Sequence, residues 1–412
     1  MSELAILGGT PVRTESFPSW PVWDETDIDA VTRAIKSGVW GTKSPEIAEF
    51  EREYAAFQGA KHGISVHTGT TAIRIALQAL GIRQGDEVIA PAYTFIGTVS
   101  PIMDLNAIPV FVDVDPKTYN IDPKAIEAAI TSRTVGIVPV HFAGLPANMD
   151  AIMEIAAQHG LWVMEDAAQA WGAQWDGVGV GHIGGAGIFS FQSSKNITAG
   201  EGGIIVTDDD ETAEAARSYM NCGRSSDGLW YGHYRVGGNY RMPAMCAALL
   251  RVQLARYPEA LAKRAENGTY LAERLSEIPG IEPTTVSPKV TRHAWHLFIW
   301  RYDAEAFDGL PRDTFLEAMR KEGVPAYQGY SIPLTEQPVF TEKRFDLSHP
   351  AQNIDFTKIE VPVAKHACES EACWLTQNVL LGSKADMDDI VTAARKVYEN
   401  RHELLKRSET AS

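Results

Sequence analysis

The chain has 412 residues, which is long for one ordinary core and predicts roughly two to three domains. Its net charge of 37 − 53 = −16 creates a surface field that disfavours binding of nucleic acid and of anionic membranes. A hydrophobic content of 45%, without an uninterrupted apolar run of about eighteen residues, indicates a packed soluble protein and excludes a disordered chain or a membrane span.

The four cysteines are too few for a disulfide scaffold in a chain of this length, and no C-x-x-C pair occurs. The N-terminal segment 1–13 has no basic head followed by a long apolar run, so no signal peptide is expected. We therefore expect a cytoplasmic protein.

Helical spacing of apolar residues occurs first at 23–38 and 47–57. Apolar β-like runs then alternate with helical patterns at 71–80, 123–130 and 149–159. The seven β-like runs are 63–66, 87–90, 109–114, 135–140, 161–164, 187–191 and 203–206. This alternation predicts an α/β fold with a seven-stranded, mostly parallel sheet that is covered on both faces.

The pattern changes beyond residue 207. A helical segment at 208–219 and a loop rich in Gly, Tyr and Trp at 225–238 precede a long helical run at 245–275, interrupted only by Pro258. A mixture of helix and strand follows, and the polar tail after Arg401 is expected to fray. The mixture comprises a strand near 295–302, a helix near 312–322, a loop through 328–338 and a helix at 387–399. We expect a large domain at 1–255 and a smaller C-terminal α+β domain at 256–412.

Two loops follow strands at the edge where open α/β sheets bind ligands. The segment 67–71 joins the first strand to a helix, so its backbone N–H groups could bind a phosphate; Gly69 would permit close approach and Thr70 would add a hydroxyl. The alternative is simple N-capping by a threonine. In the segment 91–95 an aromatic side chain could stack on a planar ring, or it could belong to the core.

A third and a fourth strand end in residues that suggest a paired site. Asp166 closes a strand with an apolar body, where a carboxylate is costly unless it meets a cation, and a protonated pyridine nitrogen would serve. Gln169 could hydrogen-bond a ring oxygen. Lys195 follows the next apolar strand; withdrawn from water it would have a lowered pKa and act as a nucleophile, although most lysines are solvated surface charges.

Two other kinds of pattern in the sequence do not indicate a functional site. The segment 179–184 matches G-x-G-x-x-G, but it does not follow a strand and open a helix, so a dinucleotide site is not expected. The pairs His293 with His296, and His62 with His67, lack a setting that would make a metal site.

Taken together, these segments resemble the DegT/DnrJ/EryC/StrS family of sugar aminotransferases, which are pyridoxal-phosphate enzymes of fold type I. The resemblance covers nearly the whole chain and rests on many short motifs in order. They are GGTPV (8–12), SGVWG (37–41), HTGTTAI (67–73), GDEVIAPAYTFIGT (85–98), PVFVDVD (109–115), PVHFAG (139–144), EDAAQAWGA (165–173), FSFQSSKN (189–196), GEGG (200–203) and GGNYRM (237–242). It implies an aspartate-aminotransferase-like fold and pyridoxal 5′-phosphate as cofactor.

The resemblance also implies roles around the cofactor ring. Lys195 matches the lysine that forms the Schiff base and then carries a proton. Asp166 matches the partner of the pyridinium nitrogen, and Gln169 the residue near the ring hydroxyl. Phe95 matches the aromatic residue that stacks on the ring face.

Phosphate contacts are implied for Gly69, Thr70 and Ser190. Asn239 matches an asparagine that reaches the cofactor phosphate of a neighbouring subunit, with Arg241 as an accessory residue. This match implies a homodimer with shared active sites.

The implied reaction moves an amino group from glutamate or glutamine to a keto sugar or keto cyclitol, and the motifs are nearest the branch of inosose aminotransferases and aminohydroxybenzoate synthases. His296, Tyr327 and Tyr330 are candidate pocket residues. A sugar dehydratase of the same fold would carry histidine in place of Lys195, and a non-catalytic regulatory protein would not need Asp166, Gln169 and Lys195 together. The identity of the acceptor stays open at this stage.

Overall fold

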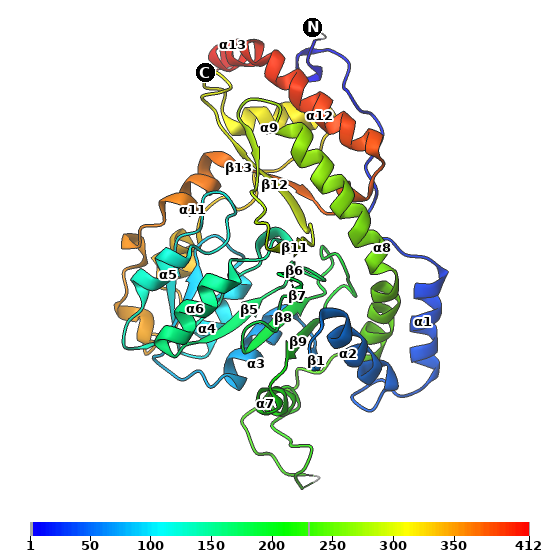
Figure 1. Ribbon diagram of the computed structural model, residues 1–412, viewed down its shortest axis with the longest axis vertical. Helices are drawn as coiled ribbons and strands as arrows, with labels where there is room; N and C mark the ends of the chain where they lie inside the picture. Colours follow the sequence, from blue (N-terminus) through cyan, green and yellow to red (C-terminus); the bar gives the residue numbers. More distant parts are fainter. Residues whose placement is uncertain (1–2, 230, 412) are drawn as a thin grey trace.

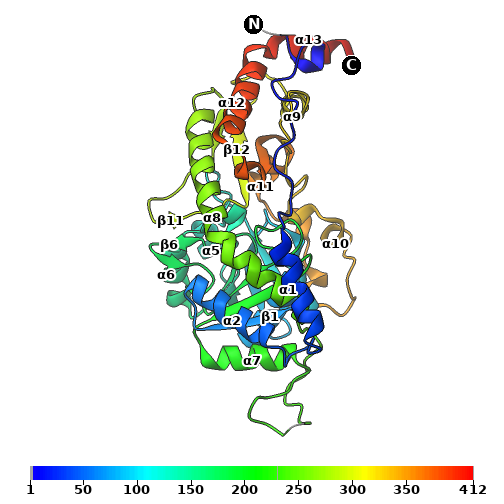
Figure 2. The ribbon, with the colours of Figure 1, turned by 90° about the vertical axis from the view of Figure 1, so that its right-hand side faces the viewer.

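The sheet that the alternating pattern predicts is present in the computed structural model, which describes residues 3–229 and 231–411 (Figures 1 and 2). Its strands lie in the order β1-β9-β8-β5-β4-β2-β3. All neighbours are parallel except β9, which runs antiparallel to both β1 and β8. The seven strands are β1 (His62–Val66), β2 (Glu87–Pro91), β3 (Ile108–Val112), β4 (Thr134–Ile137), β5 (Trp162–Asp166), β8 (Ala186–Ser190) and β9 (Gly203–Thr207).

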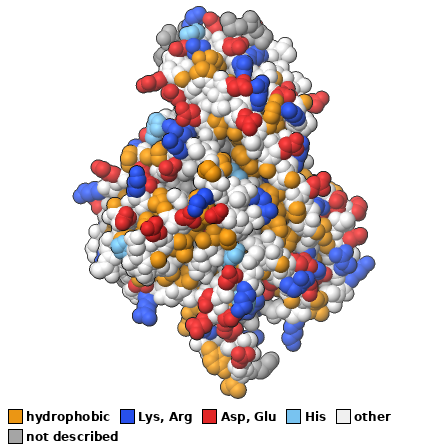
Figure 3. Space-filling model, viewed as in Figure 1, with side chains coloured by type: hydrophobic (Ala, Val, Ile, Leu, Met, Phe, Trp, Pro, Cys, Tyr) orange, Lys and Arg blue, Asp and Glu red, His pale blue; other side chains and the backbone are white. Residues whose placement is uncertain are grey.

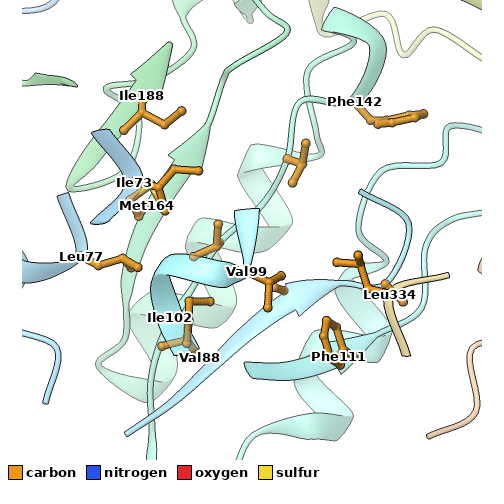
Figure 4. Packing of buried hydrophobic residues seen from close by; sticks show 14 of the residues in the cluster. Ile73, Leu77, Val88, Val99, Ile102, Phe111, Phe142, Met164, Ile188 and Leu334 are labelled. Carbon is orange, nitrogen blue, oxygen red and sulfur yellow. The ribbon is translucent and has the colours of Figure 1, made fainter. Parts of the chain in front are cut away.

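Helices cover both faces of this sheet because successive strand residues point to opposite sides. In β5, Met164 packs into the cluster that contains α3 (Gly69–Ala79) and α4 (Ser100–Asp104), together with α7 (Asp210–Met220). Its neighbour Val163 packs into the opposite cluster with α5 (Pro123–Ala129) and α6 (Met149–His159). Figure 4 shows the first of these clusters, with Ile73 and Leu77 of α3 beside Met164 and Ile188.

Polar side chains cap the N-termini of four helices that follow strands of the large sheet. Thr68, Asp122, Asn148 and Asp209 each accept a hydrogen bond from a backbone N–H in the first turn of α3, α5, α6 and α7. Such caps satisfy donors that a helix cannot pair internally. They therefore place the loops between strands and helices, where the site is built.

The C-terminal part contains a three-stranded antiparallel sheet in the order β10-β12-β13. It pairs β10 (Ile281–Pro283), β12 (Leu297–Tyr302) and β13 (Ala372–Thr376). Helices α9 (Arg312–Lys321) and α12 (Lys384–Glu399) pack on it through the cluster that includes Phe298 and Leu375. A second small sheet joins β6 (Gln174–Trp175), β7 (Val178–Gly179) and β11 (Val290–Arg292). Short helices α10 (Pro338–Thr341) and α11 (Pro362–His366) complete the connection.

Helix α8 (Ala244–Leu275) links the two halves of the molecule without a break, and it continues through Pro258 (Figures 1 and 2). It packs beside α1 (Glu25–Lys36) and α2 (Pro45–Gln58) in its first half. Its last turns, with Leu271 and Leu275, belong to the C-terminal cluster. The proposed domain boundary near residue 255 therefore falls inside this helix.

The expectation of a frayed tail after Arg401 is wrong. Residues Arg401–Ala411 form helix α13, and Leu404 is fully buried in the C-terminal cluster. One buried leucine anchors a helix that its polar composition did not predict. Among the described residues, no helix is long and apolar enough to cross a membrane.

Candidate active site

A cavity of about 820 Å³ opens where the carboxyl ends of β2, β5 and β8 meet the ends of β12 and β13. Ligands bind at this edge in open α/β sheets. Its walls come from both halves of the chain. The lining residues are Thr68, Gly69, Thr70, Ile73, Thr94, Phe95, Gly97, Thr98, Val140, Asp166, Ala168, Gln169, Ser190, Gln192, Ser194, Lys195, Glu201, His296, Leu297, Tyr330, Trp374, Thr376 and Gln377.

The N-terminus of α3 forms one wall. The Thr68 hydroxyl caps the helix by accepting from the Thr71 N–H at 3.1 Å, while the first N–H groups of the helix, at Gly69 and Thr70, have no acceptor within it. A side chain at position 69 would place its Cβ only 2.7 Å from the Cβ of Ser190. The backbone therefore approaches β8 closely, and this small cradle fits an anion such as a phosphate.

Asp166 is buried at the end of β5. Its carboxylate accepts from the Thr98 hydroxyl at 2.7 Å and from the Ala168 N–H at 3.1 Å. Burial raises the pKa of Asp166, although these hydrogen bonds and the charge of Lys195 act in the opposite direction. A cation above this carboxylate would relieve the cost of its burial, and a protonated ring nitrogen has the required charge.

Lys195 projects into the same cavity from the loop after β8. Burial lowers the pKa of its amine from 10.5 to about 8, and the nearby charge of Asp166 partly offsets this effect. Among the residues that the structure describes, no hydrogen-bond or ion-pair partner of this amine is present. A desolvated amine without a partner is a suitable nucleophile for a carbonyl group.

Gln169 is held by a backbone contact, because the Ala143 N–H donates to its Oε1 at 2.7 Å. Its amide nitrogen faces the cavity on the side of the Tyr330 hydroxyl, with which it interacts. Phe95 also lines the cavity, and its side chain is 57% exposed, as a platform for a planar ligand would be. The structure thus brings Gly69, Thr70, Phe95, Asp166, Gln169, Ser190 and Lys195 to one cavity. Anion cradle, buried carboxylate and free amine together fit pyridoxal phosphate.

Asn239 lies outside this cavity on an exposed segment that pairs with Asn221. Arg241 donates to the Asn221 side chain at 3.0 Å and also lies outside. Their roles toward a neighbouring subunit stay predictions. Of the three candidate pocket residues, His296 and Tyr330 line the cavity, whereas Tyr327 does not.

Sequence reasoning missed one wall of the cavity. Trp374, Thr376 and Gln377 lie at the end of β13, a strand that the pattern analysis did not predict. Thr98, which holds Asp166, was also missed because a threonine in a loop carries no signal of its own. The glycine motif at 179–184 has a structural role, since the N–H groups of Gly181 and Gly184 donate to the buried carboxylate of Glu165 at 2.7 and 2.8 Å. No cluster of residues that could hold a metal occurs in the described part of the chain.

Known proteins resemble this chain over nearly its full length. The profile of the DegT/DnrJ/EryC1/StrS aminotransferase family matches residues 21–392. A protein of Streptoalloteichus tenebrarius, provisionally named L-glutamine:3-amino-2,3-dideoxy-scyllo-inosose aminotransferase, is 40% identical over 97% of this chain and 98% of its own length. The L-glutamine:2-deoxy-scyllo-inosose aminotransferase of the same organism is 36% identical over 97% and 99%. The crystal structure of 3-amino-5-hydroxybenzoic acid synthase superposes with a TM-score of 0.84 at 36% identity, covering 95% of this chain and all of that one.

Proposed function

The chain belongs to the DegT/DnrJ/EryC1/StrS aminotransferase family and is a pyridoxal-phosphate-dependent aminotransferase of fold type I, and on this premise we propose that it transfers the amino group of glutamine, or of glutamate, to a keto cyclitol. The observation that carries the proposal is the meeting of Lys195, Asp166 and the α3 N-terminus in one cavity. Relatives named as glutamine:inosose aminotransferases support both the donor and the acceptor.

The charges of the cavity also favour a cyclitol over a nucleotide-linked keto sugar. Among the described residues that line the cavity, Lys195 is the one Lys or Arg, while Asp166 and Glu201 are acidic. A diphosphate would bring further negative charge to a wall without arginines, and bidentate arginine contacts are the usual means of binding phosphates. A neutral polyol needs only hydrogen-bonding groups.

When bound, the cofactor supplies the electron sink that stabilises the carbanion at the reacting carbon. Asp166 would hold the protonated ring nitrogen, and the hydrogen bonds from Thr98 and Ala168 stabilise its negative charge. Lys195 would hold the cofactor through its amine and, once freed, that amine would carry a proton to and from the donor Cα. The first N–H groups of α3 would anchor the phosphate, and Gln169 would orient the ring through its hydroxyl.

A second candidate function is suggested by the structural similarity to 3-amino-5-hydroxybenzoic acid synthase. Such an enzyme would release an aromatic product with strong ultraviolet absorption, which a saturated aminocyclitol lacks. Lys195 argues against a dehydratase of the type that carries histidine there. The full set of Asp166, Gln169 and Lys195 argues against a non-catalytic sensor.

We also propose a homodimer in which Asn239 of one subunit reaches the cofactor phosphate of the other. Exposed apolar residues on the loop after α7 support a contact surface: Leu229, Tyr231, Tyr234 and Val236 are between 55% and 95% exposed. Figure 3 shows hydrophobic side chains on the surface at the lower tip of the molecule. The four free cysteines support a cytoplasmic location.

The two half-reactions of the holoenzyme test the function separately. Glutamine should bleach the visible absorbance band of the bound cofactor, and 2-deoxy-scyllo-inosose should restore it in the aminated enzyme, with no rise in aromatic absorbance. A nucleotide-linked keto sugar serves as the competing acceptor, and Lys195→Ala as the inactive control. Failure of glutamine and glutamate to bleach the band would exclude the proposed donor, and preference for the nucleotide sugar would exclude the proposed acceptor.

A further inference from the structure

Helix α8 carries a buried arginine that lacks a counter-charge. Arg264 is 0% exposed, and its guanidinium lies 5.6 Å from the ring of Trp20 and 6.0 Å from that of Tyr257. It forms no ion pair with any residue that the structure describes, and its Nη1 has no hydrogen-bond partner. Burial lowers the pKa of Arg264 to about 10, so the group is still charged at neutral pH. An unpaired buried charge is costly, and its presence needs an explanation.

The guanidinium of Arg264 donates hydrogen bonds to one residue of the cavity wall, Gln377. The Nε of Arg264 donates to the Gln377 Oε1 at 3.1 Å, its Nη2 donates to the same oxygen, and its Nε also contacts the Gln377 backbone carbonyl at 3.3 Å. Since the oxygen of the amide faces Arg264, its nitrogen must point the other way. Gln377 lines the cavity, and its amide nitrogen has no partner among the described residues. The arginine therefore fixes a donor and polarises it.

The next residue of the cavity wall, His296, presents a hydrogen-bond acceptor instead of a donor. In the pairing of β12 with β13, Leu297 stands opposite Thr376, so His296 and Gln377 occupy the next adjacent positions. The Asn196 side chain donates to the Ala294 carbonyl at 3.0 Å, so its Oδ1 accepts from the Nδ1 of His296 at 2.9 Å. Burial holds the pKa of His296 far below its ordinary value, and the neutral ring keeps a free lone pair on Nε2. The wall thus presents one fixed donor beside one acceptor.

An amino donor such as glutamine brings a carboxylate that needs a positive partner. The cavity wall provides Lys195, which is engaged in the chemistry, and no arginine among the described residues. The charge of Arg264 lies one layer behind the wall and reaches the cavity through the amide of Gln377. We propose that Gln377 binds the α-carboxylate of the amino donor and that Arg264 is the positioning residue that orients and polarises this amide. This assignment rests on the proposed donor class.

The acceptor places different demands on Gln377. A cyclitol hydroxyl both donates and accepts hydrogen bonds, so it can pair with an amide nitrogen or with a carboxylate oxygen. A carboxylate can only accept. Replacing the amide by a carboxylate should therefore slow the donor half-reaction more than the acceptor half-reaction.

Gln377→Glu is the decisive variant, because it preserves the shape of the side chain and gives Arg264 the counter-charge that it lacks. The holoenzyme would be mixed with glutamine or with 4-aminobutanamide, which is glutamine without its α-carboxylate, and bleaching of the visible band would give the specificity constant for each. The preference of the wild type for glutamine should fall about 10- to 100-fold in the variant. The rate with 2-deoxy-scyllo-inosose should fall by a smaller factor than the rate with glutamine, since one hydroxyl contact is exchanged for another.

Arg264→Met should lower the same preference, because Gln377 loses its fixed orientation. Arg274→Met is the matched control, since Arg274 lies on the same helix with an exposed side chain paired to Glu277. An unchanged preference in Gln377→Glu would overturn the assignment, and so would equal losses with both amines. Absence of bleaching by glutamine in the wild type would instead refute the proposed donor.

Discussion

At the scale of single residues, the site depends on how a buried carboxylate and a buried amine share one environment. Burial raises the pKa of Asp166 and lowers that of Lys195, and the opposite charge of each restrains the shift of the other. This coupling keeps Asp166 available to hold a ring proton. Burial outweighs the charge of Asp166 at Lys195, so about one tenth of its amine is unprotonated at pH 7, given a pKa of about 8.

The first prediction concerns the pH dependence of cofactor uptake by the apoenzyme. Only the unprotonated amine attacks, so the rate should rise about tenfold per pH unit below pH 8 and level off above it, since the pKa of Lys195 is about 8. The folded state binds fewer protons than the unfolded state between pH 8 and 10.5, so the stability of the apoenzyme relative to Lys195→Met should increase with pH across that window. Stopped-flow absorbance and urea unfolding measure these two effects.

The variant Asp166→Asn tests whether the charge of Asp166 contributes to the pKa of Lys195. The charge of Asp166 raises the pKa of Lys195, so its removal should move the midpoint of the rate profile to lower pH. A wild-type midpoint near 10.5, as for a solvated lysine, would contradict the buried environment.

Asp166, Lys195 and Gly69 could be predicted from the sequence because each follows a recognisable apolar strand and differs chemically from it. Gln377 and Trp374 could not, because the strand before them is only five residues long and lies far along the chain from the others. Nothing in the sequence indicates that Arg264 is buried, since it is one of several charged residues that recur along its helix from Arg251 onward.

At the scale of elements, the close approach of α3 to β8 defines the anion cradle. Gly69→Ala should force a Cβ against Ser190 at 2.7 Å and destabilise the apoenzyme by about 1–3 kcal/mol. The cofactor should bind at least about tenfold more weakly, because a shift of the helix start misaligns its N–H groups. Thermal unfolding and a cofactor titration give the two values.

The double variant Gly69→Ala with Ser190→Gly separates the two effects. Removing the Ser190 side chain relieves the contact, so stability should recover in part while cofactor affinity stays low. Unimpaired affinity in Gly69→Ala alone would show that the cradle does not hold the phosphate.

The loop before β8 depends on a buried carboxylate on the strand next to it. Glu165 accepts from the N–H groups of Gly181 and Gly184 and from the Nε2 of His141 at 2.9 Å, and the Nδ1 of His141 in turn accepts from the Ala147 N–H. Glu165→Leu leaves three buried donors unpaired and should lower the free energy of unfolding by about 3–5 kcal/mol.

Chemical unfolding of the apoenzyme checks this value, with Glu154→Gln as a control at an exposed glutamate of α6. A loss below about 1 kcal/mol for Glu165→Leu would mean that water replaces the missing contacts. Position 165 also illustrates a limit of pattern analysis, because its glycine partners match a nucleotide-binding motif although they hold a carboxylate.

At the scale of the whole molecule, the proposed homodimer makes a prediction that a single chain cannot satisfy. Lys195→Ala and Asn239→Asp should each be inactive or severely impaired as pure dimers, the second because its carboxylate would repel the phosphate. In a mixed dimer, one site would contain Lys195 of one subunit and Asn239 of the other, both intact. After subunit exchange, about one quarter of wild-type activity should return, since half of the dimers are mixed and each has one working site.

The measurement is transaminase activity after mixing the two purified variants, with each variant mixed with itself as control. Activity that does not rise would place Asn239 and Lys195 in the same subunit's site or outside it. The alternating strands and helices predicted the whole seven-stranded sheet, but a partner surface has no periodic signal. The exposed loop around Val236 is visible only in the folded chain.

The unbroken path of α8 has a consequence for recombining this enzyme with its relatives. The first half of the helix belongs to the core beneath the large sheet and its last turns to the C-terminal core, with Arg264 between them. A crossover at residue 255 would join two helix halves from different parents in the middle of a packed face. Chimeras joined after Leu275, in the turn before β10, keep α8 intact but take Arg264 from one parent and Gln377 from the other, so both parents should carry this pair.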